Sequence, residues 1–243
     1  MNIHEMTISQ RVTVSHYLTI RHKESVVGLE ERRNREKKGR KNAILKAARK
    51  LFFEKGFQSI TVENIAKEAE LSKGAVYLYF KSKEEIYAQI LMNDIDKFNN
   101  SLSNIFRNDE NAAEMLKRFV EVYISFFLND RELFRILMTF MLHTDHLNFS
   151  RELSAELIKT TNKPINVIDQ IFQKGIESGE FLPHINTRQN RNALWGLING
   201  IISLHIFTGR ESTRDMRIRS TVGEVLDLII RGLSSNHSFN KIK

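Results

Sequence analysis

Two short helical segments joined by a tight turn make up residues 61–86, TVENIAKEAELSKGAVYLYFKSKEEI. The Thr61 hydroxyl can cap the free amides that open the first segment, and Ser72 can do the same for the second. Ser82 and Glu85 have the spacing of a capping box, which opens a third, longer helix. This arrangement predicts a helix-turn-helix, in which the second short helix enters the major groove of DNA.

Residues 73–80 form the expected recognition helix. Val76 and Phe80 are four positions apart, so they share its inward face. We expect them to form a small core with Ile65, Ala66 and Leu71.

The other side chains of that helix point wholly or partly outward. Gly74 allows a phosphate to approach closely, and free amides at a helix start can bind an anion. Aromatic residues at this density usually belong to a core, but Tyr77 and Tyr79 lie outside the apolar face, which favours DNA contact. The outward candidates are Lys73, Ala75, Tyr77 and Tyr79.

The region upstream combines an apolar stripe with strong positive charge. Ile44, Ala48 and Phe52 fall on one face of a helix that ends near Gly56, which suits the left-handed position after a helix. Seven of the ten residues 32–41, here called the basic segment, are Lys or Arg. Residues 1–29 show no sustained period, so we interpret residues 1–36 as a flexible basic leader.

Charge separates the first third of the chain from the rest. Residues 1–83 carry 18 Lys and Arg against 9 Asp and Glu, whereas residues 84–243 carry 19 against 20. Such asymmetry indicates a polyanionic partner, either nucleic acid or an anionic membrane surface, although a solvated basic face is the plain alternative. The basic segment could reach a minor groove or, more simply, attract phosphates without sequence preference.

Composition narrows the class of protein further. The 243 residues include no Cys, which excludes disulfides and thiolate sites, and only 2 Pro and 11 Gly, which favours long helices. No apolar run reaches the ~20 residues of a membrane helix, and no secretory signal is visible, so we expect a cytoplasmic protein. His143 and His146 lack a clear third ligand, and no catalytic motif is present. We therefore expect no enzyme activity, no metal and no cofactor.

The remaining two thirds of the chain also show helical periodicity. We expect one helix to start at Pro164 and stop at Gly179, another to span 187–207, and a last one to run from Ser212 to Gly232. The fold class is therefore all-α.

Residues 61–86, together with ILKAARKLFFEKGF at 44–57, closely resemble the DNA-binding domain of TetR-type transcriptional regulators. The resemblance implies an N-terminal three-helix helix-turn-helix domain at 37–84. A larger C-terminal helical domain at 85–235, followed by a tail at 236–243, would bind a small effector and hold a homodimer together.

The resemblance also implies roles for single residues. Thr61 and Lys83 match phosphate contacts, Lys73 and Ala75 match positions that face base edges, and Tyr77 and Tyr79 match backbone contacts. Ala75 can offer only a methyl contact, for example to thymine, so part of the sequence would be read through DNA shape.

The dimer interface and the effector pocket are placed less directly. The resemblance implies a two-fold interface of four helices in this region. We therefore assign to the dimer the apolar helix around Trp195, with Gly196 and Gly200 one turn apart, and Leu226 and Ile229 of the last helix; an ordinary core is the alternative. Asn199 is either a polar ligand contact or, more simply, a satisfied interface amide. The adaptable apolar wall expected to line the effector pocket, unless it is simple core, consists of Phe127, Phe134, Met138 and Met141.

The sequence thus predicts a repressor that a small, largely apolar effector releases from a near-palindromic operator in double-stranded DNA. The alternative is a DNA-binding structural protein, nucleoid-associated or acting at the division site, with the same fold and no inducer.

Overall fold

The computed structural model describes residues 8–106, 110–142, 147–208 and 210–235, and these are almost entirely helical. Their only extended pairing is an isolated bridge between Phe181 and Ser234. The chain divides into two compact units, residues 1–81 and 82–243. The all-α prediction is confirmed. None of the described helices is long and apolar enough to cross a membrane.

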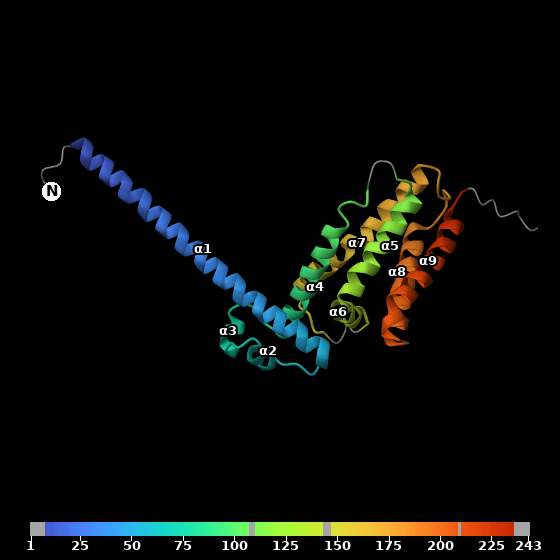
Figure 1. Ribbon diagram of the computed structural model, residues 1–243, viewed down its shortest axis with the longest axis horizontal. Coiled ribbons are helices and arrows are strands. Elements are labelled where there is room, and N and C mark those ends of the chain that lie inside the picture. Colours follow the sequence, from blue (N-terminus) through green and yellow to red (C-terminus); the bar gives the residue numbers. More distant parts are fainter. Residues whose placement is uncertain (1–7, 107–109, 143–146, 209, 236–243) are drawn as a thin grey trace, which may run out of the picture. The chain divides into compact units, whose positions relative to one another are not determined.

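The first unit is built on one long helix. Helix α1 spans Ile8–Lys55, and the short helices α2 (Val62–Glu68) and α3 (Lys73–Tyr77) follow it. In Figure 1, α2 lies beside the C-terminal end of α1, while the N-terminal half of α1 extends beyond the short helices. Residues 8–36, which fall within the leader interpreted above as flexible, are helical in the structure. The first 55 residues contain no proline to interrupt the helix.

The C-terminal half of α1 supplies the core of this unit. Ile44, Ala48 and Phe52 are buried, which confirms the apolar stripe. The ring of Phe52 lies 5.5 Å from that of Phe57, just past the helix end. Gly56 adopts a φ of 75°, the left-handed conformation expected where α1 stops.

The second unit is a bundle of six α-helices and one short 3₁₀ turn, η3 (Glu211–Thr213), among its described residues. Helix α7 packs against α4, α5 and α8, and α9 packs against α5 and α8. Aromatic rings from α4, α5, α6 and α8 fill the interior of the bundle. The helices are α4 (Lys83–Ser101), α5 (Ala112–Asn129), α6 (Arg131–Leu142), α7 (Arg151–Glu177), α8 (Thr187–Phe207) and α9 (Arg214–Leu233).

Helix boundaries in this unit match the predictions in part. Helix α8 has the predicted bounds, and Gly179 follows α7 with a φ of 74°. The predicted start at Pro164 is wrong, because α7 begins at Arg151 and runs through this buried proline. The predicted start at Ser212 is also wrong, because Ser212 lies in η3 and α9 follows it.

Candidate nucleic-acid interface

Helix α2 begins with a capping box that fixes the entrance to the helix-turn-helix. The amide of Asn64 donates to Thr61 Oγ1 at 3.2 Å, and the amide of Thr61 donates to Asn64 Oδ1 at 2.9 Å. This confirms Thr61 as the cap of α2. The Thr61 side chain is exposed, so it lies at the surface where a phosphate contact is predicted.

Three residues, 69–71, separate α2 from the cap of α3. Glu70 adopts a φ of 55°, which is rare for a residue other than glycine. The amide of Leu71 donates to the carbonyl of Ala66 at 2.9 Å, and that of Glu70 donates to Lys67 at 3.1 Å. These are the two hydrogen bonds of a Schellman motif, which satisfy carbonyls that the helix end leaves free. The motif fixes where the chain turns between the two short helices.

Helix α3 is fixed at both ends. The Ser72 hydroxyl accepts from the amide of Ala75 at 3.1 Å, so the predicted cap is confirmed. Val76 and Phe80 are buried, as are Ile65 and Ala66, which confirms most of the predicted small core. Leu71 is only half-buried.

Two lysines of α1 contact the helix-turn-helix, one just after α3 and one at the end of α2. The Lys41 ammonium lies 5.5 Å from the centre of the Phe80 ring. At the end of α2, Lys50 Nζ lies 2.6 Å from Glu68 Oε1, and this ammonium lowers the pKa of the Glu68 carboxyl. The motif is thus positioned by contacts that leave the start of α3 exposed.

The outward surface of α3 is open and carries a positive charge at its start. Lys73 is exposed, with its ammonium 3.6 Å from the Glu63 carboxylate at the start of α2. A Cβ added at Gly74 would meet only Ser72 Oγ, at 4.0 Å, so nothing within the chain requires a glycine here. Tyr77 is 48% exposed, whereas Ala75 and Tyr79 are half-buried.

Leu78 and Lys83 both follow the start of α3 in the chain but belong to different units. Leu78 is 81% exposed between the two tyrosines, although sequence reasoning did not select it. Only its departure from the inward positions Val76 and Phe80 could have indicated this exposure. Lys83 is the first residue of α4 and belongs to the second unit, whereas the predicted DNA contacts in α2 and α3 belong to the first.

The residues predicted for the dimer interface divide into two groups. Gly196 and Gly200 lie on the outer side of α8, and a Cβ added at either would meet nothing within 4 Å. Ile229 is half-buried. Leu226 instead lies on the buried stripe of α9 with Ile218 and Val222, so its side chain belongs to the core of its own unit.

The residues predicted for the effector pocket are also divided. Phe127 and Phe134 are buried, and their ring centres lie 5.7 Å apart. Met138 is half-buried, and Met141 is exposed at the end of α6. Met141 is therefore not part of this apolar cluster, because the exposed side of α6 continues through it to Leu142.

Asn199 is satisfied within the core of the second unit. Its side-chain oxygen accepts from the Tyr123 hydroxyl at 2.6 Å, and its amide nitrogen donates to the carbonyl of Trp195 at 2.8 Å. Burial raises the pKa of the Tyr123 hydroxyl, which keeps it protonated as the donor. The interpretation of Asn199 as a satisfied helix-interface amide is confirmed.

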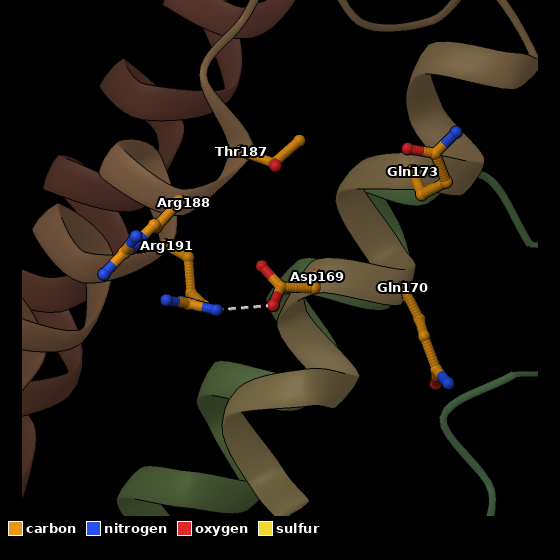
Figure 2. A pocket seen from close by; sticks show the side chains of 6 residues that line it. All are labelled: Asp169, Gln170, Gln173, Thr187, Arg188 and Arg191. Carbon is orange, nitrogen blue, oxygen red and sulfur yellow. Dashed lines mark hydrogen bonds and ion pairs between the residues drawn. The ribbon is translucent and has the colours of Figure 1, made fainter. Parts of the chain in front are cut away.

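A polar pocket of about 580 Å³ lies between α7 and the start of α8. Figure 2 shows Arg191 and Asp169 pointing toward one another across it, with Arg191 Nη1 2.5 Å from Asp169 Oδ2. None of the predicted effector residues lines it. The lining residues are Asp169, Gln170, Gln173, Thr187, Arg188 and Arg191.

The described residues contain no cluster of three His, Asp or Glu side chains that could hold a metal ion. His143 and His146 lie outside the described residues.

Comparisons with known proteins cover both units. The model of the family described as "Bacterial regulatory proteins, tetR family" matches residues 44–90. The model described as "YsiA-like protein, C-terminal region" matches residues 91–232. A "Fatty acid metabolism regulator protein" of Bacillus subtilis is 25% identical over 190 residues, which are 78% of this chain and 93% of the relative.

Two solved structures have the same fold. The transcriptional regulator FadR from Bacillus subtilis, in complex with stearoyl-CoA, aligns with a TM-score of 0.65 at 24% identity, over 79% of this chain and 98% of that one. The TetR-family regulator PfmR from Thermus thermophilus aligns with a TM-score of 0.64 at 26% identity, over 79% and 95%. With family models matching most of its length and a capped helix-turn-helix in its first unit, the chain belongs to the TetR family of DNA-binding transcriptional regulators.

Proposed function

We propose that the protein is a homodimeric repressor that a long-chain fatty acyl compound, such as an acyl-CoA, releases from a near-palindromic operator. The observation that carries the DNA-binding part is the exposed start of α3. There Lys73, the open Gly74 and Tyr77 form one accessible surface above a buried core. Lys73 reads a base edge, and Thr61, Tyr77, Tyr79 and Lys83 contact phosphates.

A homodimer presents two such helices to two half-sites. The outer side of α8 supports this assembly, because Gly196 and Gly200 leave open space in which a second helix can pack closely, and the apolar side chain of Leu204 is exposed. Leu228 of α9 is exposed as well. Half-sites one helical turn apart are about 34–36 Å from centre to centre, so the dimer must hold its two reading helices at a fixed separation.

The effector proposal rests on the interior of the second unit and on two relatives. A Bacillus subtilis relative is named for fatty acid metabolism, and a neighbour of the same fold binds stearoyl-CoA. In this chain, the rings of Tyr123 and Phe127 lie 4.7 Å apart and those of Phe98 and Phe126 lie 5.2 Å apart. An acyl chain entering here would have to separate these rings, and this would rearrange the helices that carry them.

Binding to the operator tests the DNA contacts. After the operator has been mapped on genomic DNA, Lys73→Ala is expected to lower both affinity and sequence preference. Tyr77→Phe is expected to weaken binding to all sequences by about 1 kcal/mol, the scale of one hydrogen bond. Lys159→Ala, an exposed lysine of α7, is the control. Wild-type binding by both α3 variants would show that the assigned recognition surface is wrong.

Gly200→Leu tests the dimer. A leucine at this position meets open space within one chain, so the monomer should keep its fold, whereas close packing against a second copy should be lost. Sedimentation is expected to show a monomer with unchanged helical circular dichroism. Gly28→Leu, at an open helical glycine of α1, should leave the dimer intact. A Gly200→Leu dimer of wild-type stability would place the interface elsewhere.

Stearoyl-CoA, with free CoA as the control, tests the effector. A 100-fold loss of operator affinity corresponds to about 2.7 kcal/mol of coupling, and operator DNA must then weaken stearoyl-CoA binding by the same factor. Calorimetric titration with and without the operator measures this reciprocity. Equal stearoyl-CoA affinities would contradict induction and favour a DNA-binding structural role without an inducer.

A further inference from the structure

The basic segment of α1, residues 32–41, is a charged helix that precedes the buried stripe, and its last residue, Lys41, lies over the Phe80 ring. Its Lys and Arg residues are almost all exposed, and residues 31–41 include only two acidic side chains, Glu31 and Glu36. The buried stripe of α1 begins only at Ile44. Most of the charge of this segment therefore does not serve the packing of the first unit, and its Arg32–Glu36 contact at 3.0 Å is itself exposed.

The positive charges surround the helix rather than line one face. At 3.6 residues per turn, the seven basic positions are spread around the whole circumference. A helix that packs on protein keeps one apolar face, and this segment has none. A surface of phosphates approached from any side would therefore meet several cations.

Helical structure limits how this segment can meet DNA. With side chains, an α-helix is about 10–12 Å across, whereas the minor groove of B-DNA is about 6 Å wide. The alternative in which the basic segment inserts into the minor groove as an extended arm is therefore disfavoured. A helix of this width can lie along the phosphate backbone, or across the mouth of a groove.

We propose that the basic segment binds the phosphates of duplex DNA that flanks the operator. The segment lies in the same unit as the helix-turn-helix. It is also part of the same continuous helix, α1, that supplies core residues under α3. Its ten residues rise about 15 Å, which corresponds to roughly 4 base pairs at 3.4 Å each. The inference rests on the proposed DNA-binding function and adds contacts beyond the half-site.

Salt dependence measures these contacts directly. Each phosphate contact adds about 0.9 to the slope of log affinity against log salt concentration. Neutralising Arg35→Gln, Lys37→Gln and Lys38→Gln together removes six charges from a dimer and keeps helix propensity, because glutamine is close to lysine and arginine. The slope on an operator with flanks of about 10 base pairs, one helical turn, is expected to decrease by up to about 5. The matched control, Arg151→Gln with Lys159→Gln and Arg210→Gln, neutralises three exposed residues of the second unit and should leave the slope unchanged.

Trimming the flanks gives the second arm of the experiment. Removing them should weaken wild-type binding at least tenfold and leave the triple variant almost unaffected. Sequence-specific binding with the full wild-type slope in the triple variant would overturn the inference. The inference would also be overturned if the triple variant kept the wild-type slope on DNA but lost binding to phosphatidylserine vesicles. The basic segment would then bind an anionic membrane surface. Loss of sequence preference in the wild-type protein would instead contradict the proposed function itself.

Discussion

Gly74 in α3 and Gly175 in α7 are both helical glycines, yet their surroundings are opposite. A Cβ at Gly74 would meet nothing closer than 4.0 Å, whereas one at Gly175 would overlap the Phe181 ring. The first glycine leaves room for something outside the chain, and the second leaves room for the chain's own core. In the first unit, Lys73 and Tyr77 are exposed above a small core, while in the second unit the effector candidates Phe127 and Phe134 belong to the core. Substitutions should therefore affect binding first in one unit and folding first in the other.

The largest effect is expected for Phe127→Ala. This ring is buried among Tyr123, Phe126 and Phe134, at centre distances of 4.7, 5.4 and 5.7 Å. Truncating a buried phenylalanine costs about 3–5 kcal/mol of unfolding free energy. Urea denaturation of the ligand-free protein measures it. Phe126→Ala, at a half-buried neighbour, should cost less; equal, small losses at both positions would show that Phe127 faces an existing cavity rather than a closed core.

Gly175→Ala is expected to come next. Phe181 cannot move away freely, because its amide donates to the carbonyl of Gly175 at 2.9 Å and the next amide, of Leu182, donates to Leu233 at 2.8 Å. Overpacking of this kind costs roughly 1–3 kcal/mol. Thermal unfolding should show a clear loss, whereas Gly232→Ala, with open space around it, should not. A neutral Gly175→Ala variant would mean that the ring adapts easily.

Gly74→Ala should raise the stability of the protein but weaken its binding to the operator. Alanine in place of a helical glycine stabilises a helix by roughly 0.5–1 kcal/mol, and nothing in the chain opposes it. Operator affinity should nevertheless fall, because the added methyl group occupies the space left for a phosphate. Gly28→Ala, at an open position in α1, should leave operator affinity unchanged. Higher stability with full operator affinity would remove Gly74 from the contact surface.

The smallest effect is expected for Glu63→Gln. The Glu63 carboxylate lies 3.6 Å from the Lys73 ammonium, and both side chains are largely exposed, so the pair contributes little to stability. Removing this negative charge near the DNA phosphates should tighten operator binding a few-fold. Glu68→Gln makes the same change of charge at the other end of α2, beside Lys50, and is expected to alter affinity less. Equal gains from both variants would reflect net charge alone.

The helix-turn-helix was predicted well from interactions between residues close together in the sequence. The caps at Thr61, Ser72 and Ser82, together with the left-handed Gly56, follow from side-chain chemistry within four residues, and the structure confirms each of them. The helix-turn-helix could be found in the sequence because its signals are all local.

Features that depend on contacts between distant parts of the chain could be predicted less well from the sequence. Pro164 favours a helix start, but α7 continues through it, because burial of this proline and packing against α4 outweigh the missing hydrogen bond. Leu226 and Ile229 are three positions apart, and only the arrangement of the bundle determines that Leu226 faces inward. The helical state of residues 8–36 gave no periodic signal, because the apolar residues of 8–29 are scattered without a sustained period and the charged residues that follow carry no apolar stripe.

The close packing of the rings in the second unit would also limit how fast an effector can bind. If the effector enters among Phe98, Tyr123, Phe127 and Trp195, it must wait for a rare opening of these contacts, because no ring can move without its neighbours. The rate of association would then approach a ceiling as effector concentration rises, set by how often the core opens. Apparent affinity falls in proportion to the fraction of open molecules. A substitution that loosens the rings would speed the response without touching the ligand.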